Sequence, residues 1–256
     1  MFAVTAEKAN PTDPVAGLRG GDVARPEAPD GWTWVKVRAA SLNHHDLWTL
    51  RGVGITAEQL PMILGCDAAG VEVETGREVI VHSVIGDDAV TGDETTDPNR
   101  SLLSEKHPGT FAEYVAVPRR NLVDKPQWLS WEDAACLPTA WLTAYRMVQH
   151  RANVQAGDTV LVQGASGGVA SAAIAIAKAA GLRVWATARS EQKADYARSI
   201  GADEVFEPGQ RLPQRVDAVI ETVGEATWTH SLRALRPGGT VVVSGATTGS
   251  NPPADL

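Results

Sequence analysis

"VLVQGASGGVA", residues 160–170, places an apolar run, a glycine-rich loop and the start of an alanine-rich stretch in immediate succession. The run "DTVLVQG" (158–164) predicts a buried strand, and "GVASAAIAIAKAAG" (168–181) predicts a helix that ends at Gly181. A loop in this place turns the free N–H groups and the positive dipole end of the helix toward a phosphate. We therefore predict that the loop binds the pyrophosphate of a dinucleotide.

Each residue of the loop has an expected role. Gly164 makes the tight turn, Gly167 lets the backbone approach the pyrophosphate, and Gly168 and Ala170 let the helix pack closely on the sheet. Ser166 lies in the same loop and is included among the predicted cofactor contacts. The spacing is G-x-x-G-G-x-A and departs from the strict G-x-G-x-x-G, so a tight turn without a ligand is the alternative. The order of strand, loop, helix and second strand favours the dinucleotide.

Strands and helices alternate on the C-terminal side of this loop. Strands that are apolar throughout and separated by helices predict a parallel sheet that is covered on both faces. On the N-terminal side, Ser130 and Asp133 resemble a capping box and begin a helical pattern that is interrupted near Pro138. The expected strands are 182–188, 203–206, 216–224 and 240–245, and the expected helices are 191–201 and 225–239.

The end of the second strand indicates which dinucleotide is bound. An NAD site usually carries an acidic residue there for the ribose hydroxyls, whereas this strand ends in Ala188 and the first acid, Glu191, comes too late. Arg189, Ser190 and Lys193 form a cationic, hydroxyl-bearing cluster that suits a 2′-phosphate. The sequence therefore predicts NADP(H), with a solvated helix end as the alternative for the cationic residues.

The first half of the chain has a different pattern. Short β-rich segments at 2–6, 32–40, 78–84 and 111–117 are separated by Pro, Gly and Asp, and 86–109 is a long polar loop. This pattern predicts a small, mostly antiparallel β domain over 1–125, followed by the dinucleotide-binding domain over 126–256.

Composition excludes several classes of function. The chain has 256 residues, is 43% hydrophobic and carries a net charge of −8, which argues against nucleic acid or an anionic membrane as its partner. We find no apolar run long enough to span a membrane and no signal peptide. Two cysteines, Cys66 and Cys136, are too few for a disulfide framework, so a cytoplasmic protein with a small-molecule substrate is expected.

The segment "LNHHDLW" (42–48) raises the question of a metal site. His and Asp are both metal ligands, and two histidines here precede an aspartate. If the segment is a strand, His44 and His45 point to opposite faces and do not readily share one ion.

Five ordered motifs resemble the medium-chain dehydrogenases/reductases, specifically the quinone-oxidoreductase and zinc-type alcohol dehydrogenase relatives. The resemblance implies a GroES-like catalytic domain, a Rossmann domain, hydride transfer to or from nicotinamide, and frequent homodimers. The motifs are "GCDAAG" (65–70), "GTFAEYVAVP" (109–118), "AACLPTAWLTAYR" (134–146), "GASGGVA" (164–170) and "RALRPGGTVVVSGA" (233–246).

The resemblance also implies that the zinc sites of the family are lost. Asn43, Cys66 and Thr139 stand where zinc-dependent relatives place the three catalytic ligands, and only Cys66 is a usual zinc ligand. The structural-zinc lobe would fall in 86–109, which contains no cysteine. We expect no metal, although a rearranged site of His44, His45, Cys66 and Asp67 remains an alternative.

Further roles follow from the resemblance alone. Asn43 and Trp48 are expected to line the nicotinamide pocket, and Asp67 is expected to orient its neighbours. His45 is a candidate proton donor, because imidazole side chains serve as general acids near neutral pH. Either histidine could instead be structural. The implied cofactor contacts are His44 near the phosphates, Thr143 and Val169 behind the nicotinamide, and Gly245 and Ala246.

Relatives continue beyond "GATTGSNPPADL", the last twelve residues, so we expect both domains and the parallel sheet to be incomplete. Three functions stay open. The first is an NADPH-dependent, zinc-independent reductase of quinones, enones or carbonyls. The second is a zinc alcohol dehydrogenase with altered ligands, and the third is a non-catalytic, crystallin-like NADPH-binding protein.

Overall fold

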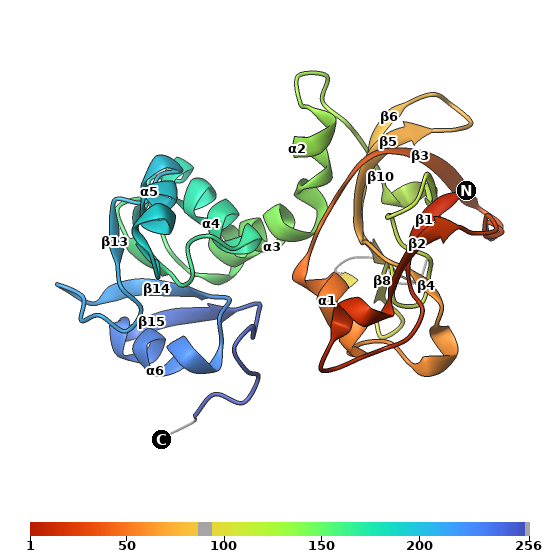
Figure 1. The fold of residues 1–256 in the computed structure, drawn as a ribbon. Coiled ribbons are helices and arrows are strands. Elements are labelled where there is room, and N and C mark those ends of the chain that lie inside the picture. The colour runs from red at the N-terminus through yellow and green to blue at the C-terminus, as the bar shows by residue number, and fades with distance from the viewer. Residues whose placement is uncertain (87–93, 254–256) are drawn as a thin grey trace. The chain divides into compact units, whose positions relative to one another are not determined.

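The computed structural model describes residues 1–86 and 94–253. The chain divides into two compact units, Met1–Thr139 and Ala140–Leu256, and each is described by itself (Figure 1). The part of the polar loop at 87–93 lies outside the described residues.

The first unit is built from antiparallel sheets, as the β-rich pattern predicts. One sheet has the order β2-β1-β4, a second has the order β10-β6-β5-β3-β9, and β7 pairs with β8. Apolar side chains of β3, β5, β6 and β9 form the core of this unit. The strands are β1 (Phe2–Ala6), β2 (Leu18–Asp22), β3 (Trp32–Ser41), β4 (Met62–Ile63), β5 (Asp67–Glu72), β6 (Glu78–Val81), β7 (Val84–Ile85), β8 (Ser101–Leu102), β9 (Tyr114–Pro118) and β10 (Leu122–Asp124).

Two α-helices belong to the first unit, α1 (His44–Arg51) and α2 (Trp131–Ala135). The sequence pattern places α2 with the second half of the chain. Its Ala134 and Ala135 instead pack against Ala69 and Ile80 of the first unit. Short 3₁₀ turns occur at Pro14–Gly17, Ala57–Gln59, Glu94–Thr96 and Arg119–Asn121.

The two histidines of "LNHHDLW" lie in a helix, so the assumption that they lie on a strand is wrong. The carboxylate of Asp46 accepts the backbone N–H of Asn43 at 2.8 Å and thereby closes the first turn of α1. The helix ends at Gly52, whose φ of +85° is the left-handed conformation that glycine adopts without strain.

The second unit contains a five-stranded parallel sheet in the order β13-β12-β11-β14-β15, as the alternating pattern predicts. This is the order of the doubly wound dinucleotide fold. The strands are β11 (Thr159–Val162), β12 (Arg183–Thr187), β13 (Glu204–Phe206), β14 (Val216–Glu221) and β15 (Leu235–Val243). The helices are α3 (Leu142–Tyr145), α4 (Gly168–Ala179), α5 (Glu191–Ser199) and α6 (Glu225–Ala234), with π-helical segments at Leu137–Trp141 and Arg146–Arg151.

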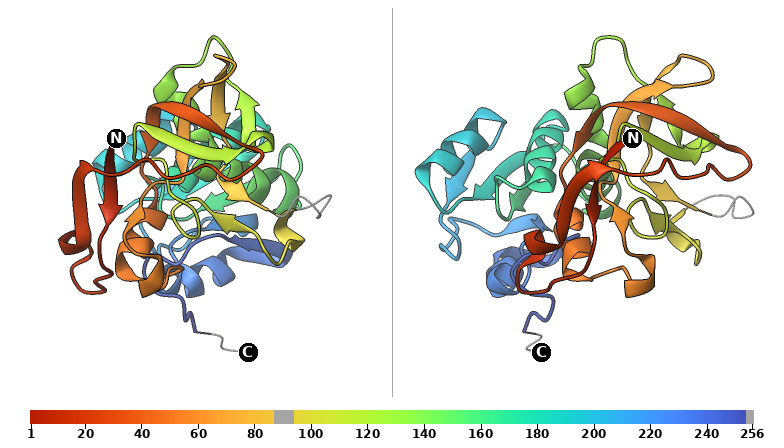
Figure 2. Two further views of the ribbon diagram at one scale, coloured as in Figure 1. Left: turned by 90° about the vertical axis from the view of Figure 1, so that its right-hand side faces the viewer. Right: turned by 45° about the vertical axis from the view of Figure 1, so that its right-hand side comes forward.

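Both faces of this sheet are covered (Figures 1 and 2). Val160, Val162 and Ile174 belong to the core under α4 and α5, while Leu161 and Trp185 belong to the core under α6. The alternation along β11 follows from the pleat, which directs successive side chains to opposite faces.

The predicted helix over 225–239 ends five residues early, at Ala234, and β15 begins at Leu235. Pro237 has no N–H to donate and Gly238 adopts φ +75°, so "RPGG" does not continue a helix. The four residues instead form a bulge, since Leu235 pairs with Val216 and Thr240 pairs with Ala218.

Among the described residues, no helix is long and apolar enough to cross a membrane.

Candidate cofactor and catalytic sites

The glycine loop lies between β11 and α4, where the sequence places it. Gly164 has φ +74°, a conformation that side chains rarely adopt. Thr187, at the end of β12, accepts two loop amides: its hydroxyl accepts the N–H of Gly164 at 3.1 Å and its carbonyl accepts the N–H of Ala165 at 2.9 Å. The entry to the loop is thus tied to the neighbouring strand.

The exit of the loop leaves donors for a ligand. Gly167 caps α4 in an extended conformation, and Ser166, Gly167 and Gly168 are exposed. The first amides of a helix have no partner within it, which here applies to Gly168, Val169 and Ala170. Ala170 is buried, and a Cβ on Gly168 would lie 3.4 Å from Ala140, as close packing of this helix requires.

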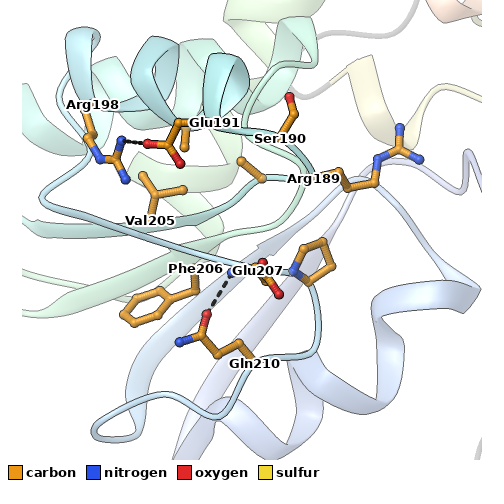
Figure 3. A pocket seen from close by; sticks show the side chains of 11 residues that line it. Arg189, Ser190, Glu191, Arg198, Val205, Phe206, Glu207 and Gln210 are labelled. Carbon is orange, nitrogen blue, oxygen red and sulfur yellow. Dashed lines mark hydrogen bonds and ion pairs between the residues drawn. The ribbon is translucent and has the colours of Figure 1, made fainter.

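A pocket of about 420 Å³ opens where β12 and β13 end (Figure 3). Because parallel strands end at the same edge of a sheet, the segments that follow β12 and β13 meet here. Arg189 and Ser190 line the pocket, as the cofactor prediction requires, whereas Lys193 is not among its lining residues.

Two acidic residues also line this pocket. Glu191 pairs with Arg198 at 2.7 Å, and the backbone N–H of Glu207 donates to the side chain of Gln210 at 3.0 Å. No ion pair involves Arg189 within the described residues, and its guanidinium is drawn apart from the Glu191–Arg198 pair (Figure 3).

The remaining predicted cofactor residues are placed as follows. Thr143 lies half-buried on α3. Gly245 passes close to the end of β14, because a Cβ there would lie 2.7 Å from the carbonyl oxygen of Thr222, and Ala246 lies against the backbone of Gly224.

In the first unit, Asn43 and Asp67 are brought together. The buried carboxylate of Asp67 accepts the Asn43 side-chain amide at 2.8 Å and the Ser41 hydroxyl at 2.9 Å on one oxygen, and the Thr139 hydroxyl at 2.5 Å on the other. Burial raises the pKa of Asp67, while the hydrogen bonds from Thr139, Asn43 and Ser41 oppose that rise.

The family's three zinc-ligand positions do not fit a zinc ion. Asn43 and Thr139 offer an amide and a hydroxyl, which are not usual zinc ligands. Each of them contacts Cys66, whose Sγ lies 3.6 Å from the Asn43 amide nitrogen and 3.5 Å from the Thr139 hydroxyl. Burial raises the pKa of the Cys66 thiol, and the neighbouring Asp67 raises it further.

A second set, His45, Asp46 and Cys66, has ligand atoms within 4.8 Å of one another. One carboxylate oxygen of Asp46 is buried without a hydrogen-bond partner. Burial raises the pKa of Asp46, its other oxygen caps α1, and His45 already binds a carboxylate. The set offers three donors of types that zinc binds, and two of them, His45 and Asp46, already have hydrogen-bond partners. His44 is outside this set and packs edge-on against Trp48, with ring centroids 5.2 Å apart.

The structure adds a residue that sequence reasoning missed. Glu105 Oε1 lies 3.0 Å from His45 Nε2, and its other oxygen accepts the N–H of Leu102 at 3.2 Å. Burial raises the pKa of Glu105, but the bonds from His45 and Leu102 outweigh it and hold that pKa below its ordinary value. No sequence signal identifies Glu105, because sixty residues separate it from His45 and its segment has no periodicity.

Both halves of the chain match known protein families. The model of the alcohol dehydrogenase GroES-like domain matches residues 29–127, and the model of the zinc-binding dehydrogenases matches residues 168–256. The acryloyl-coenzyme A reductase of Metallosphaera sedula is 34% identical, over 90% of this chain and 73% of that protein. The quinone oxidoreductase of Homo sapiens is 31% identical, over 88% of this chain and 68% of that protein.

Solved structures give the same result. A crystal structure of an NAD-dependent alcohol dehydrogenase is 34% identical, with a TM-score of 0.87 over 98% of this chain and 79% of that one. The 2-octenoyl-CoA carboxylase reductase CinF, in complex with NADP and 2-octenoyl-CoA, is 29% identical, with a TM-score of 0.88 over 99% of this chain and 72% of that one.

The fold and these matches define an oxidoreductase that combines a GroES-like domain with a Rossmann-type sheet. The chain belongs to the medium-chain dehydrogenase/reductase family. The chain spans 73% of the length of the acryloyl-coenzyme A reductase and 68% of the length of the quinone oxidoreductase, and between 58% and 76% of other curated relatives.

Proposed function

We propose that the chain is an NADPH-dependent oxidoreductase that transfers a hydride to a quinone, an enone or another carbonyl substrate without catalytic zinc. The observation that carries the proposal is the segment after β12, where Arg189 and Ser190 line the pocket and the first acidic residue, Glu191, is paired with Arg198. A guanidinium and a hydroxyl bind a 2′-phosphate by charge-assisted hydrogen bonds.

The glycine loop supports dinucleotide binding of either kind. Its exposed amides at the start of α4 suit a pyrophosphate, and this part of the site is the same for NADH and NADPH. The relatives are divided, since one solved neighbour is named an NAD-dependent enzyme and another holds NADP. The preference for NADPH over NADH is therefore proposed to depend on Arg189, Ser190 and Lys193. Lys193 lies on the first turn of α5.

When bound, the nicotinamide supplies the hydride, and the protein must position the substrate and provide a proton. His45 is the proposed proton donor, because it is half-buried and its Nε2 is hydrogen-bonded to Glu105. Asn43 and Asp67 are proposed to position the reacting groups, since their side chains hold each other at 2.8 Å.

The substrate class is proposed from the names of relatives. One relative is an acryloyl-coenzyme A reductase and another is a quinone oxidoreductase. Both names describe electron-poor π systems that accept a hydride, which matches an enone or quinone reductase.

A zinc-dependent alcohol dehydrogenase with altered ligands is the second candidate, favoured by the proximity of His45, Asp46 and Cys66. Asn43 and Thr139 at two of the family's three ligand positions argue against it, because neither side chain is a usual zinc ligand. A non-catalytic NADPH-binding protein is the third candidate.

One experiment separates the three. NADPH oxidation is followed with a panel of quinones, enones, enoyl-CoA esters and aldehydes, on protein treated with chelator and on protein supplied with zinc. Turnover of a quinone or enone without metal is expected. Turnover that requires zinc would favour the alcohol dehydrogenase, and NADPH binding without turnover on any substrate would favour the non-catalytic protein.

A further inference from the structure

The side-chain amide of Gln163 is completely buried at the end of β11, directly before the glycine loop. Its Oε1 accepts the Thr187 hydroxyl at 2.8 Å, and its Nε2 lies 3.0 Å from both Ser231 Oγ and His230 Nδ1. A buried amide is costly unless its donors and acceptor are bonded. Both N–H groups and the oxygen of the Gln163 amide have hydrogen-bond partners, so the side chain is held in one position.

The far end of this network is Glu221, which is also completely buried. Its carboxylate accepts the backbone N–H groups of Val223 at 2.8 Å and Gly224 at 3.0 Å, together with the hydroxyls of Thr227 and Ser231. The Ser231 hydroxyl has one proton and donates it to Glu221 at 2.5 Å. Ser231 must therefore accept from Gln163, which fixes the orientation of the Gln163 amide.

The near end of the network is the glycine loop. The Thr187 hydroxyl accepts the N–H of Gly164 at 3.1 Å, so its own proton must go to Gln163 Oε1. The second proton on Gln163 Nε2 then points to His230 Nδ1, and His230 Nε2–H donates to the carbonyl of Gln210, a residue of the pocket. A continuous chain of hydrogen bonds thus joins the loop to the anchored Glu221.

We propose that Gln163 is a positioning residue for the pyrophosphate of the cofactor. It holds Thr187, Thr187 holds the N–H of Gly164, and the turn at Gly164 sets where the amides at the start of α4 point. The inference rests on the proposed binding of a dinucleotide and adds to it the residue that fixes the loop.

The test replaces Gln163 by methionine, which keeps the length of the side chain and removes its hydrogen bonds. The matched control is Leu161→Met on β11, whose completely buried side chain lies in the apolar core with Trp185 and Val219 and makes none of these hydrogen bonds. Two probes are titrated: NADPH, which needs the loop, and adenosine 2′-monophosphate, which lacks the pyrophosphate. Melting temperatures record the loss of stability of each variant.

Gln163→Met is expected to weaken NADPH binding about tenfold, the usual scale for one lost polar contact, and to leave adenosine 2′-monophosphate binding within about twofold. Thr187→Val should give the same pattern, and Leu161→Met should change neither affinity even where it lowers the melting temperature equally. The proposal is overturned if Gln163→Met binds NADPH as the wild type does, or weakens both probes alike.

Hydrogen exchange at the Gly164 amide keeps the two proposals separate. Exchange there should quicken in Gln163→Met and not in Leu161→Met, with no nucleotide present. If the wild type binds no dinucleotide, the proposed function fails, and the exchange rate still decides whether Gln163 holds the loop. Unchanged exchange would show that it does not.

Discussion

At the scale of single residues, most charged groups of the two candidate sites already form ion pairs or hydrogen bonds within the protein. Glu191 and Arg198 pair with each other at the pocket, while no ion pair occupies Arg189 within the described residues. In the first unit, Glu105 is hydrogen-bonded to His45, and the carboxylate of Asp67 accepts hydrogen bonds from three side chains. Of the two arginines that line the pocket, Arg189 is therefore the one that we propose for the phosphate.

Arg189→Ala should weaken NADPH binding by roughly tenfold or more and leave NADH binding nearly unchanged, because a charge-assisted hydrogen bond to the 2′-phosphate is lost. Fluorescence titration of both cofactors at two salt concentrations measures this, and added salt should narrow the preference. Arg183→Ala, at the opposite end of β12, is the control. Equal weakening of both cofactors would assign Arg189 to a solvated helix end.

Glu105→Gln should lower kcat for the reductase and leave the Kd of NADPH unchanged, because the glutamine no longer places a carboxylate against His45 Nε2. A loss of tenfold or more is expected for a misplaced proton donor. Glu113→Gln, a substitution on an exposed carboxylate of the same unit, is the control. Unchanged kcat in Glu105→Gln would remove His45 and Glu105 from the proton path.

Cys66 should react with iodoacetamide far more slowly than Cys136 at pH 8. Burial raises the pKa of both thiols, but Cys66 is fully buried and beside Asp67, so it holds less thiolate and is less accessible. Mass spectrometry of timed samples follows each site, and denatured protein serves as the control. Equal rates in the folded protein would contradict the buried, protonated thiol.

At the scale of elements, sequence patterns predicted the strands and helices around the glycine loop but not every boundary. The helix expected over 225–239 stops at Ala234, because "RPGG" forms a bulge in β15. His44 and His45 were considered only as part of a strand, whereas they lie on α1, which the Asn43–Asp46 cap begins. Glu105 was missed, since pairing across sixty residues leaves no periodic signal.

Glu221→Gln should destabilise the second unit by about 2–4 kcal/mol, because an amide in place of the buried carboxylate turns N–H groups toward hydrogen-bond donors. Denaturant unfolding measures the loss. Glu225→Gln, in the exposed first turn of α6, is the control and should cost well under 1 kcal/mol. Similar losses of unfolding free energy in the two variants would show that the hydrogen bonds of Glu221 contribute little to the stability of the second unit.

At the scale of the whole molecule, composition and motif order were enough to predict both domain types and the family. Family membership alone does not decide whether the chain binds a metal or which cofactor it uses, since the family contains zinc-binding dehydrogenases and a reductase in complex with NADP. We propose that the metal content depends on Asn43, Cys66 and Thr139, and that the cofactor preference depends on Arg189 and Ser190.

Purified protein should therefore contain no stoichiometric zinc, and a chelator should not change its melting temperature. Elemental analysis and melts with and without chelator test this. One zinc per chain whose removal lowers the melting temperature would instead assign His45, Asp46 and Cys66 as ligands.

The most direct test of the central claim is the rate of cofactor oxidation by chelator-treated protein, with NADPH and with NADH, on the best quinone or enone of the panel. The account predicts turnover without metal and a kcat/KM for NADPH at least about tenfold above that for NADH, the ratio expected from one charge-assisted contact with the 2′-phosphate. Turnover that appears only after zinc is added, or equal use of the two cofactors, would contradict it.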